Sequence, residues 1–208
     1  IWSGGMAWIA DFPDPSNFYG PILGCAGAVK GGWNWSWYCN EELDKQATAA
    51  DITPAVNLLR SVDTINQHMR HRAINLARSA VGGTLTGRRI AVWGAAFKAG
   101  IDDVRDSPAL DVATRLHHQG ATVTVYDPQA MPQARQAAPD LAYAQTAADA
   151  AQDAHMVIVA TGWPEFGALD PQTIADDRTP ILLDTRGVIT VPRWMAADWT
   201  VLSLGYRT

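Results

Sequence analysis

From residue 89 onward, short β-rich apolar runs alternate with segments of helical periodicity. Strands are predicted over residues 89–94, 121–126, 155–160, 181–184 and 200–204, and helices over 107–118, 131–138 and 147–154, with short helical pieces between 164 and 176. The run 155–160 is almost entirely apolar, as expected of a parallel strand buried on both faces. Alternating strands and helices are typical of a doubly wound parallel sheet, so the sequence predicts an α/β domain.

A long helix is predicted ahead of this sheet. Thr53 offers a hydroxyl N-cap and Pro54 fills the first helical position, so the helix is expected to begin there. Its end is expected at the glycine pair 82–83. Apolar residues recur between these points at spacings of three and four, at Val56, Leu59, Val62, Ile65, Met69, Ala73, Leu76 and Ala80. This periodicity predicts one apolar helix face, and a separate short helix is expected over 41–50.

The first forty residues differ in composition from the rest of the chain. They are irregular and rich in tryptophan and glycine, and Asp11, Asp14 and Lys30 are their only charged residues. Such a shift indicates a domain boundary or a fusion point. We therefore expect three parts: an irregular tryptophan-rich segment over 1–50, the long helix over 51–83, and the α/β domain over 84–208.

The two cysteines, Cys25 and Cys39, both lie in the tryptophan-rich segment. A disulfide between them would stabilise the fold by about 3 kcal/mol and would imply an oxidising compartment. Two buried free thiols are the alternative. A metal site is not expected there, because no histidine lies nearby.

Charge and hydropathy exclude several classes of protein. The net charge is −5, which argues against a broad basic surface for nucleic acid. No apolar run is long enough to span a membrane, and no secretory or basic targeting segment stands at the start. The first residue is Ile1, which fits a processed chain or a fragment. Clustered tryptophans and a long apolar helix face would expose contiguous apolar surface, which predicts self-association.

The turn after the strand 89–94 concentrates charge. It holds Lys98, Asp103 and Arg105 before Ser107 caps the next helix. Ligands bind at the carboxyl ends of the strands in open α/β sheets. No G-x-G-x-x-G fingerprint is present, but a helix start can hold a phosphate with its backbone N–H groups, and Lys98 would add a positive charge. A surface lysine with salt-bridged neighbours is the alternative.

Later strand ends carry further candidates. Asp127 follows the second strand, where an acid can accept hydrogen bonds from ribose hydroxyls or simply cap the next helix. Arg186 follows the strand 181–184, and its guanidinium suits bidentate contact with a phosphate. The aromatic element from Trp163 to Phe166 either walls this crevice or packs in the core.

From about residue 58 to 204 the chain resembles the C-terminal part of the UDP-glucose/GDP-mannose dehydrogenase family. The matching stretches are 58–66, 85–94, 97–110, 125–128, 160–166 and 184–186. The Trp-Pro-Glu-Phe element at 163–166 favours the UDP-glucose branch. The resemblance implies a Rossmann-like, doubly wound sheet preceded by the end of the family's central dimerisation helix, in a homo-oligomeric cytoplasmic protein.

The same resemblance assigns roles to residues. Phe97 and Lys98 are expected to contact a UDP-sugar, Arg186 to contact the same ligand, and Arg105 to reach towards an NAD site. Asp103 and Asp127 are secondary candidates because of their places after predicted strands. The chain also departs from the family pattern. Ala99 and Ile101 stand where the family has proline and threonine, Gly162 where it has an acid, and Thr185 where it has glycine.

The parts of the family that carry its chemistry have no counterpart in this sequence. Those enzymes oxidise a sugar alcohol twice through a cysteine in a Gly-Phe-Gly-Gly-x-Cys element, and bind NAD in a domain with its own glycine fingerprint. Cys25 stands in Leu-Gly-Cys-Ala-Gly, which does not match. Hydride transfer needs cofactor, nucleophile and base held together, so this chain alone is not expected to catalyse it.

Residues 1–50 resemble a different family, the C-terminal lobe of extracellular solute-binding proteins of peptide importers. The stretches 8–18 and 34–44 carry that likeness. It implies a ligand-binding role for Asp11, a disulfide between Cys25 and Cys39, and a periplasmic or extracellular location. The two resemblances together suggest a chimera. The alternatives to a UDP-sugar-binding domain are therefore a fragment of a peptide-binding protein, or a recombined chain without evolved activity.

Overall fold

The computed structural model of the chain describes residues 41–174 and 181–204, with the backbone alone for residues 43, 44 and 46–60. The chain divides inside its long helix into two compact units, and the second begins at Gln67 and contains the sheet. The expectations for Asp11, Cys25 and Cys39, and those for the rest of residues 1–40, lie outside the described residues.

One helix, α2 (Glu41–Ala80), replaces the two helices predicted from the sequence. The predicted start at Thr53 and Pro54 is wrong, because the backbone is helical on both sides of the proline. Proline removes one hydrogen bond and crowds the preceding turn. Good helix formers, alanine above all before the proline and leucine after it, stand on both sides, so the helix propagates through this defect. The predicted end is confirmed: Gly82 and Gly83 have φ values of 93° and 88°.

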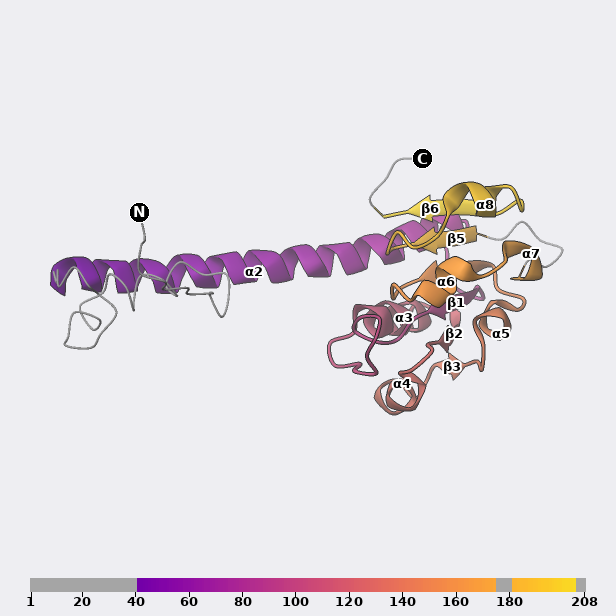
Figure 1. The fold of residues 1–208 in the computed structure, drawn as a ribbon, viewed down its shortest axis with the longest axis horizontal. Helices are drawn as coiled ribbons and strands as arrows, with labels where there is room; N and C mark the ends of the chain where they lie inside the picture. The colour runs from indigo at the N-terminus through magenta and orange to yellow at the C-terminus, as the bar shows by residue number, and fades with distance from the viewer. Residues whose placement is uncertain (1–40, 175–180, 205–208) are drawn as a thin grey trace, which may run out of the picture. The chain divides into compact units, whose positions relative to one another are not determined.

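The sheet is confirmed as parallel and doubly wound. Its six strands are β1 (Arg89–Trp93), β2 (Thr122–Tyr126), β3 (Ala142–Tyr143), β4 (Met156–Val159), β5 (Ile181–Asp184) and β6 (Thr200–Ser203). They lie in the order β3-β2-β1-β4-β5-β6, and every neighbouring pair is parallel (Figure 1). The strand order reverses between β1 and β4, and a ligand crevice is expected outside the carboxyl ends of the strands at such a point.

Short helices cover the sheet. They are α3 (Pro108–His118), α4 (Met131–Ala137), α5 (Ala147–Ala151), α6 (Pro164–Ala168), α7 (Pro171–Ile174) and α8 (Val191–Met195). Figure 1 shows α3 on one side of β1 and β2 and α5 on the other, and both helices pack against β2. The sequence did not predict β3 or α8: β3 has only two residues, and α8 has only five.

The core is built from the central strands and an aromatic cluster. All four residues of β4 are buried, as are four of the five residues of β1. Trp93, Phe166 and Trp194 are fully buried, and the Trp93 ring stacks on Phe166 with centroids 5.6 Å apart. Burial of such a side chain contributes about 1.5–3 kcal/mol, and each aromatic contact adds about 0.5–1.5 kcal/mol. The aromatic element after β4 is therefore core packing, not the wall of a crevice.

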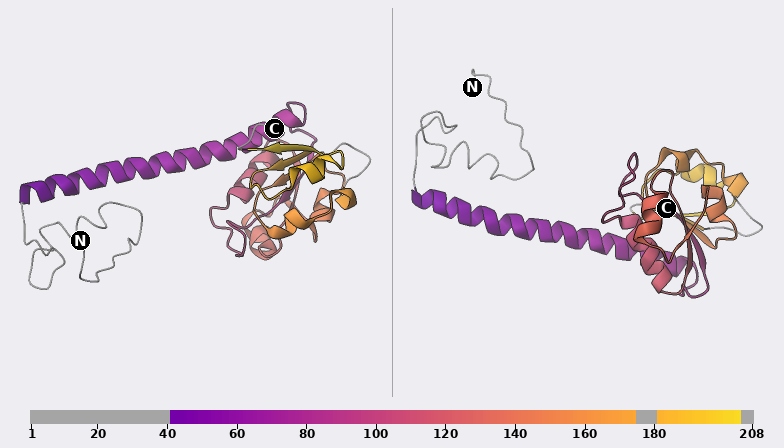
Figure 2. Two further views of the ribbon diagram at one scale, coloured as in Figure 1. Left: turned by 45° about the horizontal axis from the view of Figure 1, so that its top comes forward. Right: turned by 90° about the horizontal axis from the view of Figure 1, so that it is seen from below.

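Where the structure describes its side chains, the apolar face predicted for α2 is buried only near the C-terminal end of the helix. Ala73 of this face belongs to the core of the second unit. Figure 2 shows the C-terminal end of α2 beside the sheet. Val62, Ile65 and Met69 are instead exposed by 46%, 60% and 41%. Among the described residues, this face therefore lacks a cover over the middle of the helix.

Candidate functional site

The loop after β1 is built by a close approach between two strand ends. Gly94 has φ +113°, and a Cβ atom placed there would lie 2.4 Å from Thr161 Oγ1, so only glycine fits. The Thr161 hydroxyl donates to the carbonyl of Ala96 over 2.9 Å. The loops that follow β1 and β4 are thus in direct contact at the point where the strand order reverses.

Asp127, directly after β2, is the hub of this region. Its side chain is buried, with 1% of the residue exposed. Oδ2 accepts from the backbone N–H groups of Ala95 and Ala96, at 2.8 and 3.0 Å, and from Trp163 Nε1 at 3.0 Å. Oδ1 accepts from the N–H groups of Gln129 and Ala130, both at 2.9 Å. These bonds order the turn before α4 and the loop after β1, whereas α4 itself begins after Ala130 without a side-chain cap.

The loop after β1 is closed by further bonds. The Ser107 hydroxyl donates to the Ala95 carbonyl over 2.6 Å and accepts from the Leu110 N–H at 3.3 Å, which confirms Ser107 as the N-cap of α3. The Phe97 N–H donates to the Asp103 carbonyl over 2.8 Å. Phe97 is 48% exposed and Lys98 is also exposed. Both side chains therefore extend outward from a loop whose backbone is fixed.

Arg186 stands on a similar loop after β5. Asp184 is buried and accepts from the N–H groups of Arg186, Gly187 and Ile189 at 2.8–2.9 Å. Arg186 Nε donates to the Ala160 carbonyl over 2.6 Å, which places the guanidinium beside the end of β4. Burial lowers the pKa of Arg186, and the charge of Asp184 opposes that shift. The structure shows no partner for the terminal guanidinium nitrogens among the described residues.

Asp103 and Arg105 form a pair on the exposed part of the loop after β1. Arg105 Nη2 lies 2.6 Å from Asp103 Oδ2, and the Arg105 side chain is 90% exposed. Hydrogen bonds from Arg105 lower the pKa of Asp103 to about 2. Arg105 is therefore charge-compensated within its own loop, as the surface-loop alternative anticipated for this turn.

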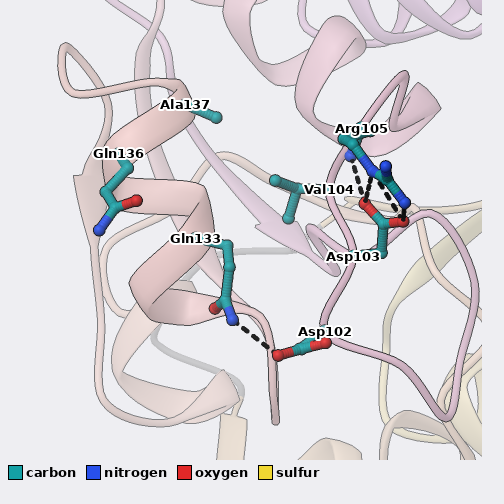
Figure 3. Close-up of a pocket in the computed structure, with 7 residues that line it drawn as sticks. All are labelled: Asp102, Asp103, Val104, Arg105, Gln133, Gln136 and Ala137. Carbon is teal, nitrogen blue, oxygen red and sulfur yellow. Dashed lines mark hydrogen bonds and ion pairs between the residues drawn. The ribbon is translucent and has the colours of Figure 1, made fainter.

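A cavity of about 580 Å³ lies between this loop and α4 (Figure 3). Its lining residues are Asp102, Asp103, Val104, Arg105, Gln133, Gln136 and Ala137. Gln133 Nε2 donates to Asp102 Oδ2 over 2.7 Å and bridges the two walls. Phe97, Lys98 and Arg186 are not among the lining residues, so this cavity is distinct from the expected nucleotide-sugar contacts.

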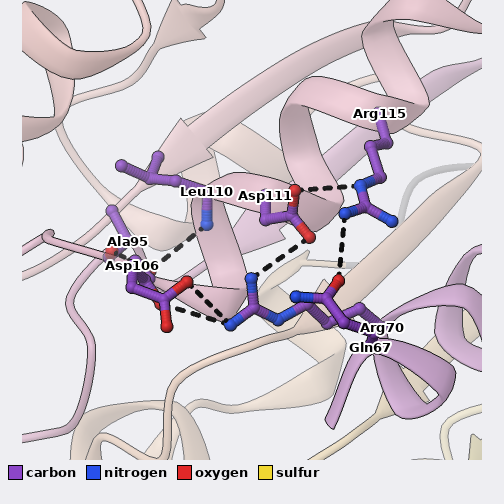
Figure 4. A network of polar contacts seen from close by, with 8 residues as sticks. Gln67, Arg70, Ala95, Asp106, Leu110, Asp111 and Arg115 are labelled. Atoms are coloured by element: carbon purple, nitrogen blue, oxygen red, sulfur yellow. Dashed lines mark hydrogen bonds and ion pairs between the residues drawn. The ribbon is translucent and has the colours of Figure 1, made fainter. Parts of the chain in front are cut away.

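A polar network that the sequence did not reveal fixes α3 against the C-terminal part of α2 (Figure 4). Arg70, whose side chain is 10% exposed, contacts Asp106 at 3.0 Å and Asp111 at 3.4 Å. Arg115 bonds to Asp111 at 2.9 Å and to Gln67 at 3.2 Å. Only the i, i+4 spacing of Asp111 and Arg115 was visible in the sequence. The network holds the helix that starts directly after the charged loop.

The structure thus brings the predicted site residues to one edge of the sheet. Lys98 follows β1 and Arg186 follows β5, on either side of β4 in the strand order. Among the described residues, no group of histidine, cysteine and carboxylate side chains is placed to hold a metal ion. In the same part of the chain, no helix has the length and hydropathy needed to cross a bilayer.

A doubly wound sheet with cationic loops at its carboxyl edge defines an α/β nucleotide-binding domain. Residues 91–191 match the UDP-binding domain of the UDP-glucose/GDP-mannose dehydrogenase family. The α/β domain of this chain belongs to that family.

Known relatives agree with this assignment. A UDP-glucose 6-dehydrogenase of Rhizobium meliloti is 35% identical over 158 residues, which is 76% of this chain and 36% of the relative. The UDP-glucose 6-dehydrogenase AglM of Haloferax volcanii is 37% identical over 159 residues, again 76% and 36% of the two chains. The chain therefore spans about a third of the length of these curated relatives.

Solved structures show the same fold. A UDP-glucose dehydrogenase from Pyrobaculum islandicum superimposes with a TM-score of 0.61 at 31% identity, and the match covers 71% of this chain and 32% of that one.

Proposed function

We propose that the α/β domain binds the UDP part of a UDP-sugar at the carboxyl edge of its sheet. The observation that carries this proposal is the placement of Lys98 and Arg186 at that edge, on two loops that are each anchored by a buried aspartate. A diphosphate between them would meet a point charge from lysine and a planar guanidinium fork from arginine. The exposed Phe97 ring offers an apolar surface beside them for the rest of the ligand.

In a full-length enzyme this domain would supply the nucleotide-sugar half of an NAD-dependent UDP-glucose 6-dehydrogenase. The relatives named above are UDP-glucose 6-dehydrogenases, which supports UDP-glucose as the sugar nucleotide. We propose the cytoplasm as the compartment, as the family resemblance implies. Arg105 would extend from its exposed loop towards the NAD site of such an enzyme. Since the chain spans about a third of those relatives, we propose substrate binding, not catalysis, for the chain alone.

NAD does not fit the loop after β1 of this domain. A dinucleotide in that position needs free backbone N–H groups at a glycine-rich turn. Here the N–H groups of Ala95 and Ala96 are taken by Asp127, and no G-x-G-x-x-G sequence is present. We therefore assign no step through NAD to the residues of this domain.

We also propose that the protein self-associates through α2. The support is the exposed apolar face formed by Val62, Ile65 and Met69, which we call the α2 stripe. Exposed contiguous apolar surface marks interfaces in soluble proteins.

The proposed ligand site is tested by calorimetric titration with UDP and with UDP-glucose. Wild-type protein is expected to bind both, and Lys98→Ala or Arg186→Ala to weaken binding about tenfold or more, since a hydrogen bond to a charged group contributes about 1.5–3 kcal/mol. Arg72→Ala is the matched control, because it removes a positive charge from an exposed position on α2. Wild-type protein that binds neither ligand, or an Arg72→Ala variant that loses affinity equally, would contradict the proposal.

A further inference from the structure

Asp127 is a buried anion held by N–H groups alone. Its two carboxylate oxygens accept five hydrogen bonds of 2.8–3.0 Å, four from backbone amides and one from an indole. None of the ion pairs among the described residues includes it. Bonds to an ionised acceptor are about twice as strong as neutral ones, so this donor set replaces a cationic partner for a charge that is 99% withdrawn from solvent.

The donors come from three different strand ends. The N–H groups of Ala95 and Ala96 follow β1, those of Gln129 and Ala130 follow β2, and the Trp163 indole follows β4. Ala95 and Ala96 directly precede Phe97 and Lys98 in the chain. One carboxylate therefore fixes the backbone from which both exposed side chains of the proposed site extend.

The position of this carboxylate also has chemical meaning. Successive backbone N–H groups after the first strand of a doubly wound sheet form the cradle that takes a ligand phosphate in dinucleotide-binding domains. In this chain the same kind of cradle encloses a side-chain carboxylate. The negative charge that these N–H groups bind therefore comes from the protein itself and not from a ligand.

We propose that Asp127 is a positioning residue: its carboxylate replaces a ligand phosphate at the loop after β1, closes that loop to a dinucleotide, and sets Phe97 and Lys98 in place for a nucleoside diphosphate. The last part rests on the function proposed above. The internal anion explains how the loop is ordered before any ligand arrives, which lowers the entropy cost of binding.

The first arm of the test does not involve a nucleotide. In Asp127→Ala, amide exchange at Ala95 and Ala96, followed by NMR, is expected to be at least about tenfold faster than in the wild type. Formate, a small carboxylate that fits the vacated place, is expected to slow the exchange again and to shift the same amide signals and the Trp163 indole signal. Asp140→Ala is the control, since it removes an exposed carboxylate of the same domain.

If the alanine variant does not fold, Asp127→Asn replaces it in this experiment. The asparagine side chain has the same volume, but only one of its two terminal atoms can accept hydrogen bonds, so one set of N–H donors loses its acceptor. It is expected to loosen the same amides. Folded protein in which Ala95 and Ala96 keep wild-type exchange rates, with no response of Asp127→Ala to formate, would overturn the anchoring role whatever the nucleotide does.

The second arm is titration with UDP. Folded Asp127→Asn is expected to bind UDP at least about tenfold more weakly, and formate to restore most of the affinity of Asp127→Ala. A residue that only stabilises the fold would lower the melting temperature and leave the affinity of the folded protein unchanged, and that result would overturn the positioning role. If the wild-type protein does not bind UDP, the proposed function is contradicted, and so is the positioning role of Asp127. The anchoring role is then still decided by the amide-exchange experiment.

Discussion

Asp127 and Asp184 are buried at the ends of β2 and β5, and each accepts bonds from several backbone N–H groups. Lys98 and Arg186 extend from the loops that these aspartates order. A buried amide that loses its partner costs about 1–3 kcal/mol, so the acids stabilise one loop conformation strongly. The two buried carboxylates thus lie inside the loops, and Lys98 extends outward, where an anionic ligand can reach it.

At the same scale, the Asp103–Arg105 pair permits a direct titration. Arg105→Ala is expected to raise the pKa of Asp103 from about 2 towards its ordinary value of 3.8, because hydrogen bonds from the Arg105 side chain are the largest cause of the low pKa. The measurement is the pH titration of the Asp103 carboxyl carbon by NMR. Arg72→Ala should leave that titration unchanged, and an unaltered Asp103 pKa in Arg105→Ala would disprove the assigned cause.

The stability consequence of this pair is limited. A carboxyl whose pKa is lowered by folding contributes stability above its unfolded pKa and loses that contribution as the pH falls through the folded value, here between about 4 and about 2. Arg105 is 90% exposed, so solvent screens the pair. We expect no change in melting temperature at neutral pH for Arg105→Ala.

Among the helices, α3 is joined most directly to the loop that carries Lys98. Its N-cap Ser107 is buried and bonds to the Ala95 carbonyl as well as to Leu110 N–H. Arg70 of α2 pairs with Asp111 of α3, and Arg115 of α3 donates to Gln67 of α2. Because α3 is held at its start and along one face, the C-terminal end of the charged loop before it is also held in place.

Ser107→Ala is expected to lower the free energy of unfolding by about 1–2 kcal/mol, because it removes a cap and leaves the Ala95 carbonyl without its partner. Chemical denaturation measures this change. Thr146→Ala is the matched control: Thr146 caps α5 through the Asp149 N–H but makes that bond at an exposed position. Equal losses in the two variants would show that the Ala95 bond contributes nothing.

For the whole molecule, the central question is what covers the α2 stripe. Burial of a side chain of this size contributes about 1.5–3 kcal/mol, and Val62, Ile65 and Met69 leave much of that contribution unused in a single chain. An oligomer that buries the stripe would recover it.

Light scattering over a wide concentration range is therefore expected to show an average mass above that of one chain. Ile65→Glu should shift the population towards the monomer, since a charge at the centre of the stripe would be buried without a partner. Thr64→Glu adds the same charge away from the stripe and should not. A wild-type protein that stays monomeric throughout would refute self-association.

Several features could be predicted from residue patterns. The end of α2 at Gly82 and Gly83, the start of α3 at Ser107 and the buried strand β4 follow from local chemistry, because caps, φ-permissive glycines and continuous apolar runs act within a few residues. The charged turn after β1 and the arginine after β5 were located for the same reason. The predicted helix start at Pro54 was wrong, because good helix formers on both sides of the proline outweigh the local start signal.

The sequence by itself determined the class of fold and which loops carry charge, since alternation of strands and helices and the residue types at strand ends are local properties. Only the tertiary structure decided what those charges do. Asp127 allowed two interpretations until the strand order placed Ala95, Ala96 and Trp163 around it. Hydrogen bonds between residues more than thirty positions apart depend on the packing of the whole sheet, and no local pattern encodes them.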